Sequence, residues 1–254
     1  MARFFLSRDM MRPETGEISI FGGDAHHIAY SLRMAVGDMV IVCDMQMTEY
    51  HCTISAIRPD EVRLHIDRIE SNDTELPVRI HIYQSLPKGD KMEYIIQKAV
   101  ELGAASLTPV MSRRCIVKLD DKCVAKKLTR WQKIAEEAAK QCGRGYIPEI
   151  RQPRSFEDAI KEGAAMDVPL FCYEGDGTVS LKSVLENVKS SAPVNGMEQL
   201  SSAVFIGPEG GYDIKEVHLA QSAGITCVNL GKRILRCETA SGFVLSAMTY
   251  VFEL

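Results

Sequence analysis

The order of strand and helix signals in the second part of the sequence constrains the fold more than any other feature. A strand pattern at 78–84 precedes a helix whose apolar residues recur at helical spacing, and a second strand follows at 106–111. The helix has Asp90 and Glu93 spaced as a capping box, and Gly103 at its end. Two strands joined by such a helix run in parallel, so we expect an α/β fold with a parallel sheet.

The same alternation continues to the end of the sequence. The expected elements are strands at 168–173, 203–206 and 225–230, and helices around 131–142, from Asp213 to Gly224, and from about 238 to 254. A polar stretch at 187–202 predicts a mobile loop among them.

The first seventy residues have a different pattern, with short strand signals separated by turn residues. We expect a helix over 25–34, capped by Asp24, and strands at 39–43, 50–57 and 62–69. Short strands in this arrangement predict a small β-barrel. The polar segment 71–77 ends in proline and is the best boundary, so we expect two domains, 1–73 and 74–254.

Charge is distributed unevenly along the chain. The net charge is −4, yet residues 77–150 carry +6 and the segments on either side are acidic. The excess gathers between 111 and 133, where we select Arg113, Arg114, Lys126 and Lys127 as candidate contacts to a polyanion. A solvated helix face is the alternative interpretation of the same charges.

Several common sites are absent from the sequence. It contains no P-loop, no dinucleotide-binding glycine motif and no nucleophile elbow. None of the eight cysteines forms a CxxC pair, and the adjacent His26 and His27 make a poor metal pair, so we expect no metal. No apolar run is long enough for a membrane span or a signal peptide, so we expect a cytoplasmic protein with reduced cysteines.

Two glycine-containing segments follow predicted strands. Residues 205–211 read Phe-Ile-Gly-Pro-Glu-Gly-Gly and lead into a capped helix, and residues 230–240 read Leu-Gly-Lys-Arg-Ile-Leu-Arg-Cys-Glu-Thr-Ala. Ligands of parallel α/β sheets bind at the carboxyl ends of strands, and glycine lets the backbone approach a ligand closely. A tight connection without function would not require three glycines, a proline and an acid.

These segments resemble those of the RsmE family of ribosomal RNA uridine-N3 methyltransferases, in the SPOUT superfamily. Supporting matches are 88–93, 97–99 and 141–144, together with His26-His27, Leu32-Arg33 and Gly37-Asp38 in the first part. Cys237 departs from the pattern, because the family commonly has threonine there. The resemblance implies a PUA-like barrel followed by a methyltransferase domain with a deep trefoil knot, acting in 16S rRNA processing and ribosome biogenesis.

The resemblance also implies the cofactor S-adenosyl-L-methionine, bound by the strand-end segments 171–174, 206–211 and 230–236. Glycine and aliphatic residues suit it, since adenine needs an apolar slot and backbone hydrogen bonds. The candidate cofactor-binding residues are Tyr173, Glu174, Ile206, Gly207, Gly211, Leu230, Gly231, Ile234, Leu235 and Arg236.

The implied reaction is methylation of uracil N3, which is not a nucleophile until its proton leaves. Arg236 is our candidate for stabilising the anion, and Glu209 is the candidate proton acceptor, with Glu238 as an alternative that can equally cap a helix. Because N3 lies on the pairing edge, the target base must be unpaired or flipped out. The alternatives are ribose 2′-O methylation and a noncatalytic RNA-binding module; against the first, Glu238-Thr239-Ala240 replaces the Ser-Leu-Asn segment typical of those enzymes.

The last predicted helix is apolar on nearly all sides, leaving a narrow polar strip chiefly of Ser246, Thr249 and Glu253. A helix of this kind must be covered almost all round. We therefore expect a homodimer in which a second subunit covers part of it, as the resemblance also implies. Burial within the core of one subunit is the alternative.

Overall fold

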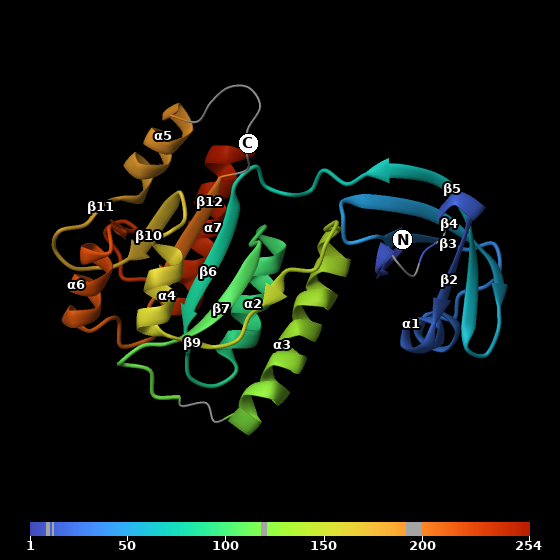
Figure 1. The fold of residues 1–254 in the computed structure, drawn as a ribbon, viewed down its shortest axis with the longest axis horizontal. Coiled ribbons are helices and arrows are strands. Elements are labelled where there is room, and N and C mark those ends of the chain that lie inside the picture. The colour runs from blue at the N-terminus through green and yellow to red at the C-terminus, as the bar shows by residue number, and fades with distance from the viewer. Residues whose placement is uncertain (9–10, 12, 118–120, 192–199) are drawn as a thin grey trace. The chain divides into compact units, whose positions relative to one another are not determined.

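The computed structural model describes residues 1–8, 11, 13–117, 121–191 and 200–254 (Figure 1). The chain forms two compact units. The first contains Met1–Glu75 and Ala139–Ile147, and the second contains Leu76–Ala138 and Pro148–Leu254.

A five-stranded sheet forms the first unit, in the order β1-β3-β4-β5-β2. Its strands pair antiparallel except for β1 and β3, and its core contains Phe4, Ile20, Val42, Ile54 and Leu64, which are all fully buried. The predicted strand-rich first part is thus confirmed. The strands are β1 (Ala2–Phe5), β2 (Glu17–Phe21), β3 (Met39–Cys43), β4 (Thr48–Ile57) and β5 (Glu61–Ser71).

The helix expected over 25–34 differs from the prediction. A 3-10 turn η2 (Pro13–Thr15) precedes β2, then α1 (Gly22–His26) begins directly after β2 and continues as a π-helical turn η3 (His27–Ser31). Asp24 therefore lies inside the first turn, and the N-cap residue is Phe21, whose side chain makes no capping bond. The cap prediction was wrong because the strand runs into the helix without an intervening turn.

A buried ion pair fastens the segment Ala139–Ile147 to the rest of the first unit. The Arg144 side chain is almost fully buried and donates to both carboxylate oxygens of Glu75, with a distance of 2.9 Å from Nε to Oε1. Nearby, Nδ2 of Asn72 donates to the carbonyl oxygen of Gly143 at 3.0 Å. Removing one partner of such a buried pair would leave an uncompensated charge, so replacing Arg144 or Glu75 alone is expected to destabilise this unit.

The second unit contains an eight-stranded parallel sheet. Its order is β11-β13-β10-β12-β6-β7-β8, and β9 also pairs with β7. This confirms the expected parallel sheet. The strands are β6 (Arg79–Ser85), β7 (Ser106–Met111), β8 (Glu149–Ile150), β9 (Arg154–Ser155), β10 (Val168–Cys172), β11 (Val179–Ser180), β12 (Ser201–Ile206) and β13 (Thr226–Asn229).

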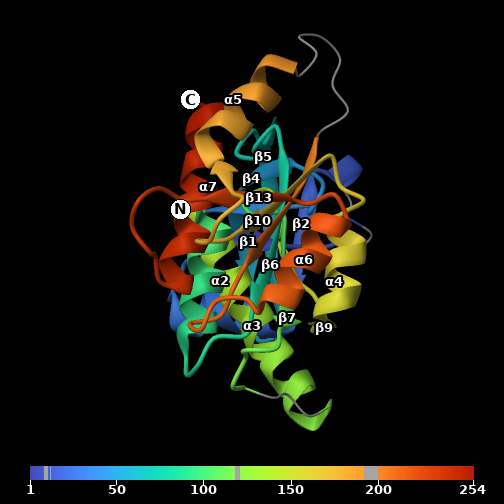
Figure 2. The same ribbon diagram turned by 90° about the vertical axis from the view of Figure 1, so that its left-hand side faces the viewer.

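Helices cover both faces of this sheet (Figure 2). On one face α4 (Phe156–Gly163) and α6 (Ile214–Ser222) pack on a core that includes Phe171 and Phe205. On the other face α2 (Lys91–Glu101) and α7 (Cys237–Phe252) lie against each other, and α7 also contacts β6, β12 and α5 (Leu181–Ser191). The long helix α3 (Asp121–Cys142) passes from the second unit into the first.

The two predicted capping boxes have different outcomes. In α6 the Asp213 side chain accepts a backbone N–H, and the Glu216 side chain accepts the N–H of Asp213, as expected. In α2 the Asp90 side chain makes no capping bond. Glu93 instead forms an ion pair with Arg130 of α3, with 2.7 Å between Oε2 and Nη2. A tertiary partner therefore replaced the local one.

The loop expected at 187–202 was wrong at both of its ends. Helix α5 continues to Ser191 and β12 begins at Ser201, while residues 192–199 lie outside the described residues. Within the described part of the chain, no helix is long and apolar enough to cross a membrane.

Candidate cofactor pocket

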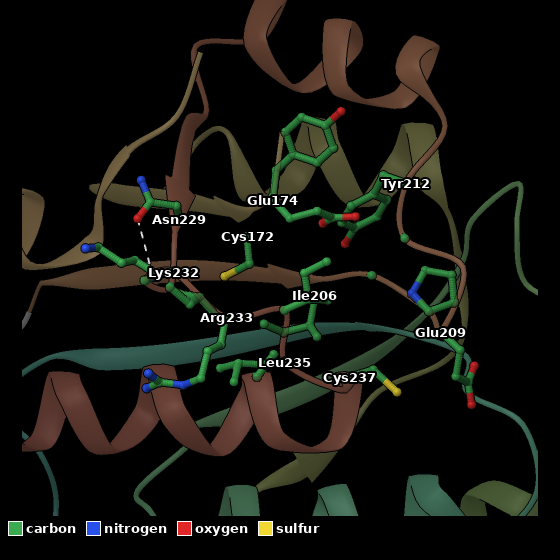
Figure 3. A pocket seen from close by; sticks show the side chains of 18 residues that line it. Cys172, Glu174, Ile206, Glu209, Tyr212, Asn229, Lys232, Arg233, Leu235 and Cys237 are labelled. Atoms are coloured by element: carbon green, nitrogen blue, oxygen red, sulfur yellow. Dashed lines mark hydrogen bonds between the residues drawn. The ribbon is translucent and has the colours of Figure 1, made fainter. Parts of the chain in front are cut away.

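A pocket lies at the carboxyl ends of β10, β12 and β13, where three loops leave the parallel sheet (Figure 3). Its lining comes from 172–174, from 206–212, from 229–235, and from the first turns of α7. This edge is where parallel α/β sheets bind ligands, because loops there diverge and leave space above the strands. The two glycine-containing segments singled out in the sequence therefore meet in one place.

The loop after β12 needs its glycines for close packing. Gly211 has a φ of +64°, and a Cβ added there would lie 2.8 Å from Oε1 of Glu174. A Cβ on Gly207 would lie 3.2 Å from the ring of Tyr212, which itself packs on Phe171 with 4.2 Å between ring centroids. The loop is thus held against an aromatic core while its glycines keep the pocket open.

The loop after β13 forms the opposite wall. Gly231 has a φ of +101°, and its N–H donates to Oδ1 of Asn229 at 3.4 Å (Figure 3). Ile234 is 85 % exposed although it is apolar, and Leu235 is half-buried beside it. An exposed aliphatic side chain at a pocket wall is positioned to cover an apolar part of a ligand.

The structure brings together nearly all residues selected from the sequence for the cofactor. Nine of the ten line the pocket: Tyr173, Glu174, Ile206, Gly207, Gly211, Leu230, Gly231, Ile234 and Leu235. Arg236 lies outside this lining; it is exposed and is the N-cap residue that precedes α7. Glu209 belongs to the lining, and Glu238 lies in the first turn of α7.

Sequence reasoning missed part of the lining. Outside the three predicted strand-end segments, the additional lining residues are Tyr212, Asn229, Cys237 and Ala240. Within those segments, the lining also includes residues that were not selected individually, namely Cys172, Pro208, Lys232 and Arg233. Their positions next to selected residues were the available signal. Burial raises the pKa of the Cys172 and Cys237 thiols to about 12, so both remain protonated and neither is poised as a nucleophile.

The four basic candidates lie in two places. Arg114 donates from Nη1 to the carbonyl oxygen of Gly210 at 2.8 Å, and the backbone N–H of Arg113 donates to Oε1 of Glu216 at 2.7 Å. Lys126 and Lys127 lie on α3 and line a second hollow. The other residues of that hollow are Gly89, Asp90, Met92, Glu93, Arg130 and Trp131.

The lining of the first pocket suits an organic ligand. Among the described residues, no group of three or more histidine, cysteine or acidic residues could hold a metal ion. The pocket instead offers glycine backbone, aliphatic side chains and a few polar groups, the combination that recognises a ligand with an apolar ring and polar substituents.

Comparison with known proteins identifies the class that this fold and pocket define. A family model described as an RNA methyltransferase domain matches residues 74–249, and one described as an RNA methyltransferase PUA domain matches 22–67. The fold and pocket are thus those of a two-domain RNA methyltransferase. A Bacillus subtilis protein named ribosomal RNA small subunit methyltransferase E is 38 % identical, over 100 % of this chain and 98 % of its own. This chain belongs to that family.

Two similar solved structures contain a ligand. A ribosomal RNA small subunit methyltransferase E from Neisseria gonorrhoeae, bound to S-adenosyl methionine, has a TM-score of 0.82 and 27 % identity, covering 99 % of this chain and 98 % of its own. A putative methyltransferase from Legionella pneumophila, in complex with the same cofactor, has a TM-score of 0.83 and 29 % identity, covering 98 % and 97 %.

Proposed function

We propose that this protein transfers a methyl group from S-adenosylmethionine to N3 of a specific uridine in 16S ribosomal RNA. The observation that carries the proposal is the pocket in which the glycine-rich loops after β12 and β13 meet. Family membership supports the reaction class, and the named relatives support small-subunit rRNA as substrate. The resemblance noted in the sequence supports the N3 position.

The pocket fits this cofactor. Gly211 has a φ of +64°, a backbone conformation that residues with a Cβ rarely adopt, so the path of the loop along the pocket favours glycine there. We propose that 206–211 and 230–235 hold the cofactor, with Tyr173 and Glu174 beside them. When bound, it supplies an electrophilic methyl group on a positively charged sulfur.

The protein must align the uracil and favour loss of its N3 proton. We propose that Glu209, at the pocket edge, accepts this proton, with Glu238 in the first turn of α7 as the alternative acceptor. Arg236 is the proposed cation on the side of loop 230–236, where it can approach the developing anion. The target base is flipped out or unpaired, because N3 lies on its pairing edge.

Contacts with rRNA are proposed for two parts of the chain. We propose that a PUA-like barrel at 1–73 binds RNA, and that the methyltransferase domain at 74–254 is knotted. The exposed cations Arg113, Arg114 and Lys126, with Lys127, would contact phosphates. Because the proposed substrate is ribosomal RNA, we place the reaction in the cytoplasm.

We propose that the protein is a homodimer that covers the remaining apolar surface of α7. One side of α7 is buried against its own domain, including Val244, Leu245 and Met248, on a helix that contacts α2, α5 and the sheet. On its other side Phe243 is 43 % exposed and Tyr250 is 72 % exposed. Aromatic side chains left in water on one helix are typical of an interface.

Sedimentation of the unmodified protein across a dilution series tests the dimer. We expect a species of twice 28.2 kDa at micromolar concentration. A Phe243→Asp/Tyr250→Asp variant is expected to sediment as a monomer, because two buried charges would oppose association. A monomer mass for the unmodified protein, with methyltransferase activity intact, would rule the dimer out.

Methyl transfer itself tests the proposed function. We expect the protein to transfer one methyl group per RNA from labelled S-adenosylmethionine to 16S rRNA, and mass spectrometry of the digested RNA to identify 3-methyluridine. A 2′-O-methylated nucleoside would contradict the N3 assignment. Binding of RNA without binding of the cofactor in calorimetry would contradict the enzyme assignment and favour an RNA-binding module.

A further inference from the structure

Lys91, the first residue of α2, connects three segments that are far apart in the sequence. Its Nζ lies 3.0 Å from Oε1 of Glu209 in the glycine-rich loop and 3.4 Å from Oε2 of Glu238 in the first turn of α7. Oε1 of Glu209 also accepts the backbone N–H of Lys88 at 3.1 Å. Carboxylates on two different elements therefore hold one ammonium group in place.

The contacts within this cluster favour the charged forms of all three side chains. Burial alone raises the pKa of the Glu209 carboxyl, but hydrogen bonds from its own backbone N–H, from Lys91 and from Lys88 lower it below the usual value. Glu238 shows the same balance: burial raises its pKa, and its backbone N–H, Cys237 and Lys91 lower it overall. The hydrogen bond to Glu209 raises the pKa of Lys91. An ionised carboxylate of low pKa is a weak base.

A weak base can take the N3 proton only if the uracil anion is itself stabilised. Lys91 is placed to do this, because Glu209 lines the cofactor pocket and the Lys91 side chain is 35 % exposed beside it. An ammonium group has three N–H donors. Two face the carboxylates, in the contacts found among the described residues, and the third is available to a ligand at the pocket edge.

We propose that Lys91 donates a hydrogen bond to a carbonyl oxygen of the target uracil and stabilises the anion formed when N3 loses its proton. This inference rests on the proposed function. The N3–H bond breaks and the proton passes to Glu209, while negative charge spreads from N3 onto the flanking carbonyl oxygens. The N3 electron pair then forms the bond to the methyl carbon as the carbon–sulfur bond breaks, which leaves a neutral thioether. Glu209 and Glu238 hold the cation ready for this step.

Single-turnover methylation of 16S rRNA by the full-length protein, measured against pH, tests this role. We expect the plateau rate of Lys91→Met to fall about 100-fold, since one preorganised donor to a developing anion is worth ~10²–10³ in rate. The pH below which the rate of this variant falls should also rise by at least about one unit, because removing a cation raises the pKa of adjacent carboxyls. Lys91→Arg keeps the positive charge and should recover at least tenfold of the lost rate.

Lys98 provides a matched control. It lies on the same helix and its side chain is 37 % exposed. Its Nζ pairs with Oε2 of Glu101 at 2.6 Å, and Glu101 lies outside the pocket lining, whereas the Lys91 partner Glu209 belongs to it. Lys98→Met should keep both the plateau rate and the pH profile. In all three variants, calorimetry should give a cofactor Kd within threefold of that of the unmodified protein, and thermal unfolding should show a folded state.

Three results would overturn the assignment of Lys91. The first is a folded Lys91→Met variant with unchanged plateau rate and pH profile. The second is an equal loss of methylation rate in Lys91→Met and Lys91→Arg. The third is loss of cofactor binding in a Lys91 variant. Either of these two results would show that the residue has a purely structural role. Absence of methyl transfer by the unmodified protein is a different result, which contradicts the proposed function on which the inference rests.

Discussion

A Gly211→Val variant is expected to bind S-adenosylmethionine at least tenfold more weakly than the unmodified protein, a loss of about 1.4 kcal/mol or more in calorimetry. Gly211 has a φ of +64°, which a branched side chain does not tolerate, and its added Cβ would lie 2.8 Å from Oε1 of Glu174. Gly207→Val should lose affinity similarly, because its side chain would meet Tyr212 at the pocket floor.

A variant at Gly224 is the control that distinguishes the effect of backbone strain from the effect of a damaged pocket. Gly224 follows α6 with a φ of +82°, and a Cβ there would meet nothing within 4 Å. Gly224→Val therefore carries comparable backbone strain away from the pocket, and it should lower stability while leaving the cofactor Kd unchanged. Unchanged cofactor affinity in folded Gly207→Val and Gly211→Val proteins would contradict the assignment of this pocket as the cofactor site.

Replacing Arg113, Arg114, Lys126 and Lys127 by glutamine is expected to weaken rRNA binding by orders of magnitude at low salt. The dependence of log K on log salt should flatten by ~0.7–0.9 for every phosphate that the variant no longer neutralises. Lys126 and Lys127 line the hollow on α3, whereas Arg114 also holds the carbonyl of Gly210. The Lys126→Gln/Lys127→Gln pair should therefore spare cofactor affinity, and filter binding across a salt series measures the change in slope.

Lysines on other helices provide the control for net charge. A Lys161→Gln/Lys182→Gln protein has the same change in charge as the lysine pair, but on α4 and α5, where both side chains are exposed. Its salt slope should match that of the unmodified protein. If the fourfold variant keeps the original slope, the basic segment is a solvated helix face, as the alternative interpretation holds.

Local sequence patterns were sufficient for most elements and for most of the pocket. Alternation of apolar residues, capping residues such as Asp213, and glycine at a strand end act over a few residues, so each can be read without knowing the fold. The loops 206–211 and 230–235 follow two strands that both pair with β10, and a parallel sheet brings their carboxyl ends to one edge.

Other predictions failed where a tertiary contact replaced a local one. Glu93 has the right spacing to cap α2, yet it pairs with Arg130 of another helix. The loop prediction at 187–202 extended too far in both directions, because α5 includes Ser191 although its last turn is polar. Packing on neighbouring elements decides such ends, and sequence spacing does not contain that information.

Residues close together along the chain were enough to predict the parallel α/β architecture, the glycine-rich strand ends and the family resemblance. Which distant side chains meet depends instead on the folded backbone. Lys91 and Glu209 are 118 positions apart, and their contact exists only because α2 and the loop after β12 leave neighbouring strands at the same edge. Arg144 joins the first unit in the same way, 69 positions from Glu75. Such distant side chains come into contact and become buried only when the protein has folded, so spacing along the chain could not reveal these ion pairs.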